Sequence, residues 1–107
     1  MASGIYNRLS LAAATYTNVI TTSQVAAGKV SVVTLNFVNT DSTASINIRV
    51  ALSTSATPAA GEFLEYDTQL KPSGVLERTG IVVPAGMGLV VYASAAGMNA
   101  IAYGFEG

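Results

Sequence analysis

The sequence predicts an all-β protein, a single antiparallel β-sandwich that is jelly-roll-like and has about eight strands. Three observations lead to this prediction. Turn-forming residues recur at intervals of strand length. Apolar and polar residues alternate with a period of two in the clearest segments. No window combines a helical period of apolar residues with helix caps.

The N-terminal part of the chain contains three candidate strands. Residues 1–14 are interpreted as an N-terminal arm or a first strand, and residues 15–107 as the sandwich domain. YTNVITT, residues 16–22, is the next candidate strand, followed by the loop SQVAAG. KVSVVTLNFVN, residues 29–39, is apolar on both faces, which is typical of a buried central strand.

The segment ASINIRVALS, residues 44–53, alternates most clearly. It follows the turn NTDST, whose Asn, Asp and Ser side chains can bond neighbouring backbone. Because a slip of one residue would expose every apolar side chain, we expect a fixed register. The residues expected to face the core are Ala44, Ile46, Ile48, Val50 and Leu52. Those expected to face outwards are Ser45, Asn47, Arg49, Ala51 and Ser53.

Four more strands are expected in the second half. EFLEYDTQL and VLERTGIVV are separated by the turn KPSG, and Gly80 inside the second predicts a bulge or a close backbone approach. GLVVYAS and AIAYGFE follow the PAG turn, and SAAGMN between them predicts a β-hairpin. In AIAYGFE one face carries Ile101, Tyr103 and Phe105, and the other carries Ala102, Gly104 and Glu106.

An uncharged run, residues 82–105, raises the alternative of a membrane helix, for which about 20 apolar residues suffice. One proline and four glycines interrupt the run, and each disfavours a helix by roughly 1–3 kcal/mol. We therefore prefer the two strands and expect no membrane partner. The interrupting residues are Pro84, Gly86, Gly88, Gly97 and Gly104.

The composition limits the possible functions. Hydrophobic residues make up 50% of the 107-residue chain and charged residues only 10%, so we expect one domain with much of its surface against other protein. The five basic residues are scattered and the net charge is −1, so nucleic acid is not an expected partner. No cysteine is present and no basic segment precedes the first apolar run, so we expect neither disulfides nor a secretion signal.

Few residues suit catalysis. The absence of His, Cys and Trp excludes Ser–His and Cys–His pairs and most zinc and iron sites, so we expect no enzyme and no cofactor. In GEFLEYD, strand alternation places Glu65 and Asp67 on one face, with Glu62 and Tyr66 on the other. A calcium or acid–base site is one interpretation; a solvated face or an intersubunit ion pair is preferred. The five tyrosines could stack on sugars, but core or interface packing is favoured.

Four motifs follow one another along the chain, ASGIYNRLS, GVLERTGIVVPAG, VVYAS and YGFE. In the order of these motifs the chain resembles small virion structural proteins of tailed bacteriophages, including cyanobacterial and other aquatic phages. The resemblance implies a β-sandwich in a virion assembled in the bacterial cytoplasm. It implies a head decoration or cement protein that contacts the major capsid protein or other virion proteins. A tail, neck or fibre subunit and a carbohydrate- or receptor-binding module remain alternatives.

Two segments are candidate contact surfaces. In the arm ASGIYNRLSL, Tyr6 and Arg8 are of types enriched at interfaces, and Ile5, Leu9 and Leu11 either anchor the contact or complete the core. The second candidate is the loop SATPAAGEF, with Pro58 and Phe63. A closed homo-oligomer is expected, with a trimer favoured.

Overall fold

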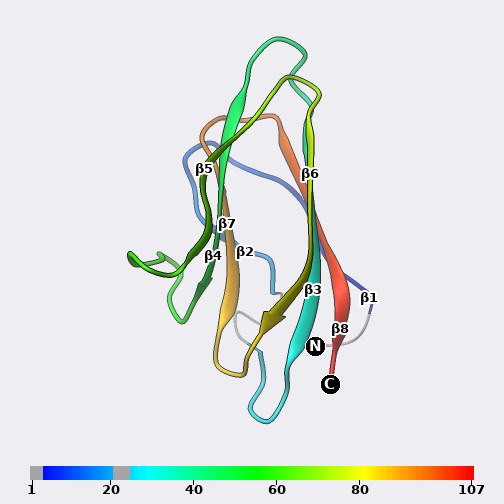
Figure 1. Ribbon diagram of the computed structural model, residues 1–107, viewed down its shortest axis with the longest axis vertical. Helices are drawn as coiled ribbons and strands as arrows, with labels where there is room; N and C mark the ends of the chain where they lie inside the picture. Colours follow the sequence, from blue (N-terminus) through cyan, green and yellow to red (C-terminus); the bar gives the residue numbers. More distant parts are fainter. Residues whose placement is uncertain (1–3, 21–24) are drawn as a thin grey trace.

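A computed structural model describes residues 4–20 and 25–107, with the side chains of residues 4–6 outside the description. The strands lie in two facing layers (Figure 1). Their bounds are β1 (Gly4–Ser10), β2 (Thr17–Asn18), β3 (Ser31–Asn39), β4 (Ile46–Ser53), β5 (Phe63–Leu70), β6 (Val75–Val83), β7 (Gly88–Ala93) and β8 (Met98–Glu106).

The two sheets have the strand order of a jelly roll. Sheet A runs β1-β8-β3-β6 and sheet B runs β2-β7-β4-β5. The first strand pairs with the eighth, the second with the seventh, the third with the sixth and the fourth with the fifth, all antiparallel. The predicted fold class is therefore confirmed.

The core lies between the sheets, where large residues of β3 face small residues of β8. Phe37 pairs with Ala100 and Leu35 with Ala102, and all four are at most 1% exposed. This alternation of large and small side chains fills the inner layer of sheet A without forcing the strands apart. On this strand Met98 also faces the core, whereas Ile101, Tyr103 and Phe105 project from the other face of the sheet.

The predicted hairpin between the last two strands is wrong. Both strands form, but β7 belongs to sheet B and β8 to sheet A, so residues 94–97 cross from one sheet to the other. Turn residues such as Gly97 permit a tight hairpin or a crossover equally well. The choice depends on distant pairings, since β8 lies between β1 and β3.

The alternation of β4 is confirmed in direction but only partly in burial. Ile46, Ile48 and Val50 face the core and are fully buried. The expectation for Ala44 is wrong, because it is exposed before the strand begins. Ala51 and Ser53 face outwards as predicted, but they are buried there. Leu52 faces inwards but stays half-buried, because it lines an opening between the sheets.

Other expectations about individual strands have mixed outcomes. The bulge at Gly80 is confirmed, because the β3–β6 register shifts opposite it and its φ is +67°. β3 is central as predicted, but only one of its faces is fully buried. In the segment 16–22 the strand is limited to Thr17–Asn18, and residues 21–22 lie outside the description.

Candidate functional site

The outer face of sheet A is unusually apolar. Phe105 is 57% exposed, Val82 55% and Val75 63%, and all three project from this face. Phe105 and Val82 flank Val32 in register, and Val75 lies at the other end of β6. Neighbouring exposed apolar side chains on a folded protein indicate an interaction surface. We call this surface face A; its apolar members are Val32, Val38, Val75, Val82, Ile101, Tyr103 and Phe105.

Polar groups lie in the middle of face A. The Tyr103 hydroxyl donates a hydrogen bond to Glu77 Oε2 at 3.3 Å. Partial burial and the nearby Glu77 carboxylate raise the pKa of Tyr103. Beside Glu77 on β3, the Oδ1 atom of Asn36 is buried without a hydrogen-bond partner in the described part of the chain. An unpaired buried acceptor typically costs about 1–3 kcal/mol.

The outer face of sheet B carries a different surface, built around Arg49 of β4. Its guanidinium lies 4.3 Å from the ring centroid of Tyr66 and 4.6 Å from that of Tyr92. Further rings follow, with Tyr16 4.9 Å from Tyr92 and Phe63 4.8 Å from Tyr66. We call this the aromatic–arginine cluster; its members are Tyr16, Arg49, Phe63, Tyr66, Asp67 and Tyr92.

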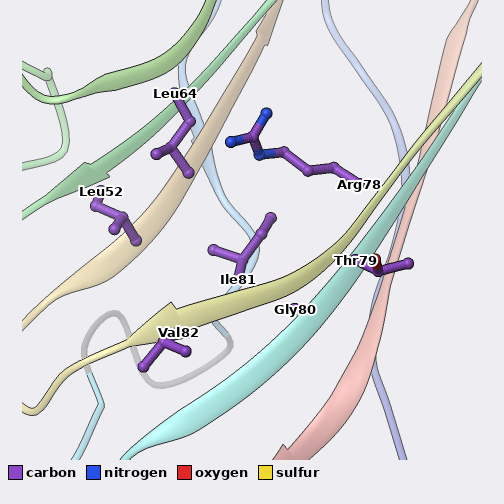
Figure 2. A pocket seen from close by; sticks show the side chains of 7 residues that line it. All are labelled: Leu52, Leu64, Arg78, Thr79, Gly80, Ile81 and Val82. Carbon is purple, nitrogen blue, oxygen red and sulfur yellow. The ribbon is translucent and has the colours of Figure 1, made fainter.

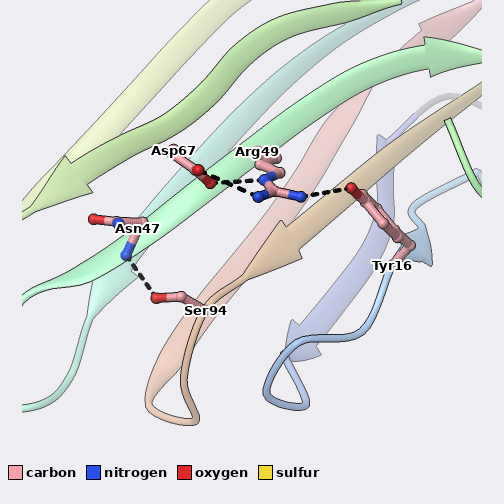
Figure 3. Close-up of polar contacts among 5 residues, drawn as sticks. All are labelled: Tyr16, Asn47, Arg49, Asp67 and Ser94. Carbon is pink, nitrogen blue, oxygen red and sulfur yellow. Dashed lines mark hydrogen bonds and ion pairs between the residues drawn. The ribbon is translucent and has the colours of Figure 1, made fainter. Parts of the chain in front are cut away.

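Hydrogen bonds hold Arg49 in place (Figure 3). It donates to both carboxylate oxygens of Asp67, at 2.6 and 3.2 Å, and to the Tyr16 hydroxyl at 2.9 Å. The bond to Asp67 is the largest cause of a raised pKa of Arg49, and the same bond lowers the pKa of Asp67. The cluster therefore joins β4, β5 and the segment before β2.

The cluster also explains the unexpected burial on the outer face of β4. Ala51 pairs with Phe63 on one side and with Val90 on the other. Both Ala51 and Val90 are at most 1% exposed. The rings of the cluster lie over this end of sheet B, so small apolar residues there are covered although they face away from the core.

An opening between the sheets lies where β5 and β6 form neighbouring edges. Its volume is about 230 Å³, and Leu52, Leu64, Arg78 and Ile81 point towards it (Figure 2). Arg78 is the single titratable side chain in the lining, and it forms an ion pair with Glu65 at 2.6 Å. This pair connects the two sheets at the edge of the opening.

The predicted arrangement of the acidic segment is wrong. Asp67 has a φ of +51°, and the β4–β5 register shifts beside it, so β5 bulges. As a result Glu65 bonds Arg78 of sheet A, whereas Asp67 bonds Arg49 on the outer face of sheet B. Within residues 4–20 and 25–107, no three acidic residues come together as a potential metal site. Both carboxylates instead form ion pairs within the chain.

The residues expected at an interface are divided between different surroundings. Arg8 is exposed on face A, where it pairs in register with Ile101. Leu9 packs partly against the core, and Leu11, which is 3% exposed, belongs to the core. Of the two alternatives for these leucines, the structure therefore favours completion of the core over an anchoring contact.

The remaining predicted contact residues lie elsewhere. Ile5 and Tyr6 belong to β1, but their side chains lie outside the description. Pro58 is half-buried in its loop. Phe63 belongs to the aromatic–arginine cluster, on the opposite side of the sandwich from Arg8.

Sequence reasoning missed the residues that dominate face A, among them Val75, Val82 and Phe105. The alternation of β8 did contain a signal, because it separated Ile101, Tyr103 and Phe105 from a face of small residues. Whether that face points inwards depends on what β3 supplies to the core, which the alternation alone does not reveal.

The chain matches no protein-family model, no curated protein and no solved structure. The described residues include no helix of the length and hydropathy needed to span a membrane. The uncharged run that suggested one contains β7 and most of β8.

Proposed function

We propose that this protein is a non-enzymatic structural protein of a bacteriophage particle, and that it acts as a decoration or cement protein of the assembled head. The observation that carries this proposal is face A, where Val75, Val82 and Phe105 are each more than half exposed. A chain with only 10% charged residues that exposes such a face needs a neighbouring protein to cover it.

The sequence resemblance also supports the proposal, and the fold is compatible with it. The motif order resembles that of small virion proteins. The jelly roll recurs in viral capsid domains, but also in lectins and cupins, so the fold by itself does not select a function. A protein that binds only the assembled shell stabilises that shell by mass action. Many copies make the total effect large even when each contact is weak.

The test is to locate the chain in particles. Phage particles are purified on a density gradient from a lysate that contains the chain, and analysed by mass spectrometry and cryo-electron microscopy. We expect the chain in many copies distributed over the head. A few copies around a symmetry axis would identify a tail, neck or fibre subunit instead. A chain that stays in the soluble fraction while particles form would refute the virion role.

The aromatic–arginine cluster favours a second candidate, a carbohydrate- or receptor-binding module. Tyr66 is 58% exposed, and its ring adjoins Arg49 and Phe63. An exposed ring next to fixed polar groups can stack on a sugar. A glycan array tests this: binding that Tyr66→Ala abolishes would support the module. Tyr103→Ala, on the opposite sheet, is the matched control. An array without signal would remove the carbohydrate-binding candidate and leave the structural role as the remaining proposal.

A further inference from the structure

One cross-strand row of face A has opposite charges at its two ends. Arg8 of β1 pairs with Ile101 of β8, Ile101 with Asn36 of β3, and Asn36 with Glu77 of β6. Arg8 and Glu77 are both exposed. Three strand spacings of about 4.8 Å separate their backbones, roughly 14 Å in all, and in the described part of the chain they form no ion pair with each other.

We propose that face A is the interface of a symmetric dimer, in which a second copy of this chain lies face to face with the first. This inference rests on the proposed structural role, because it names what covers the apolar face. In a two-fold interface the same surface must complement itself. The arrangement of charge on face A meets that condition for one particular axis.

The axis runs parallel to the strands and passes between β8 and β3, the two central strands of sheet A. Rotation about it places β6 of the second copy over β1, and β1 of the second copy over β6. Arg8 then faces Glu77 of the second copy, and the same pair forms again at the other edge. Packed sheets lie about 10 Å apart, a gap that an arginine and a glutamate side chain span together.

The same rotation matches apolar residues. Phe105 and Val32 are cross-strand partners on β8 and β3. They lie on either side of the axis, so Phe105 faces Val32 of the second copy and Val32 faces Phe105 of the second copy. Large and small apolar groups are thereby opposed twice, as in the interleaved inner faces of a sandwich.

A two-fold axis across the strands would be worse. It would place Arg8 over β1 of the second copy and Glu77 over its β6, so that neither charge meets its opposite. Face-to-face packing about that axis loses both ion pairs, and the lengthwise axis is therefore the one that the charges select.

The size of face A predicts a moderate affinity. Four strands are roughly 19 Å wide, and residues 32–38 extend about 23 Å along them, which gives a flat area of roughly 440 Å². Side-chain relief increases this area, but it stays near or below the standard of about 800 Å² per partner. We therefore expect an equilibrium between monomer and dimer that depends on concentration.

Charge reversal and rescue test the proposal, using sedimentation equilibrium of the full chain. The wild-type mass should rise with concentration from 10.9 kDa towards twice that value. Arg8→Glu and Glu77→Arg should each weaken association about tenfold or more, because like charges then face each other. The double variant Arg8→Glu/Glu77→Arg should restore it. Lys71→Glu, with the same charge change as Arg8→Glu but at the exposed turn between β5 and β6, should have no effect.

Circular dichroism and thermal melting of each variant separate lost association from lost folding. A monomer at every concentration, a trimer mass, or single variants that the double variant does not rescue would overturn the dimer. The particle experiment gives a separate outcome. If the chain is found in particles but is monomeric in solution, the virion role stands and the dimer proposal fails. If the double variant restores the dimer but the chain is absent from particles, the dimer proposal stands and the virion role fails.

Discussion

Gly104 offers the sharpest test of the packing of sheet A. It lies on β8 between β1 and β3, pairing with Gly4 and Val33, with a φ of +155°. A Cβ atom added there would lie 1.9 Å from the carbonyl oxygen of Val32 and 3.0 Å from its carbonyl carbon. Both contacts are to backbone, so no side-chain rotation can relieve them. Gly104→Ala requires that β3 or β8 move by roughly 1 Å within the close-packed sandwich.

The expected cost follows from two contributions. Overpacking typically costs 1–3 kcal/mol, and an alanine at positive φ about 1–2 kcal/mol more. Gly104→Ala should therefore lower the free energy of unfolding by about 2–5 kcal/mol, and the melting temperature by roughly 10–25 °C. Thermal melting followed by circular dichroism measures this directly.

Gly86→Ala is the matched control. Gly86 also has positive φ, +82°, but an added Cβ would meet nothing within 4 Å. This variant isolates the backbone contribution, and we expect it to lose only about 1–2 kcal/mol. If both variants melted within about 3 °C of each other, the close approach of β8 to β3 would add little to the cost of Gly104→Ala, and the overpacking argument would be refuted.

Three further predictions concern the core, a buried amide and an ion pair. Phe37→Ala, at a site that is 0% exposed, should cost about 3–5 kcal/mol in urea unfolding. Asn39 donates to the carbonyl oxygens of Ala44, Leu70 and Lys71, so Asn39→Ala should cost about 2–4 kcal/mol; an unchanged urea midpoint would contradict that role. Arg49 lowers the pKa of Asp67 below its ordinary 3.8, so the stabilisation exists above that pH and is lost as the pH falls through the folded pKa. Asp67→Asn should therefore melt below wild type near pH 7, and the two melting temperatures should converge as the pH falls through the lowered folded pKa of Asp67.

Local features were predictable where local chemistry decides them. The alternation of residues 46–50 fixes which side of β4 faces the core, because successive side chains point to opposite faces. The bulge at Gly80 was predictable because glycine adopts positive φ without strain. The bulge at Asp67 carried no comparable signal, since a non-glycine residue seldom takes this conformation.

The candidate surfaces were only partly predictable. Arg8 was expected at an interface and lies on face A, but the leucines that follow it pack on the core side. The aromatic–arginine cluster joins Tyr16, Arg49, Tyr66 and Tyr92 from four separate segments. Such a meeting depends on strand order, which no local pattern contains.

The sequence by itself determined an all-β chain, the approximate positions of its longer strands, and the lack of histidine and cysteine chemistry. The tertiary structure alone decided which strands are neighbours, and thus that β7 and β8 lie in different sheets. It also decided that Tyr103 and Phe105 point outwards while Ala102 points into the core. The physical reason is that Leu35 and Phe37 of β3 already fill the space opposite β8, and a strand's inner face depends on such partners far away in the sequence.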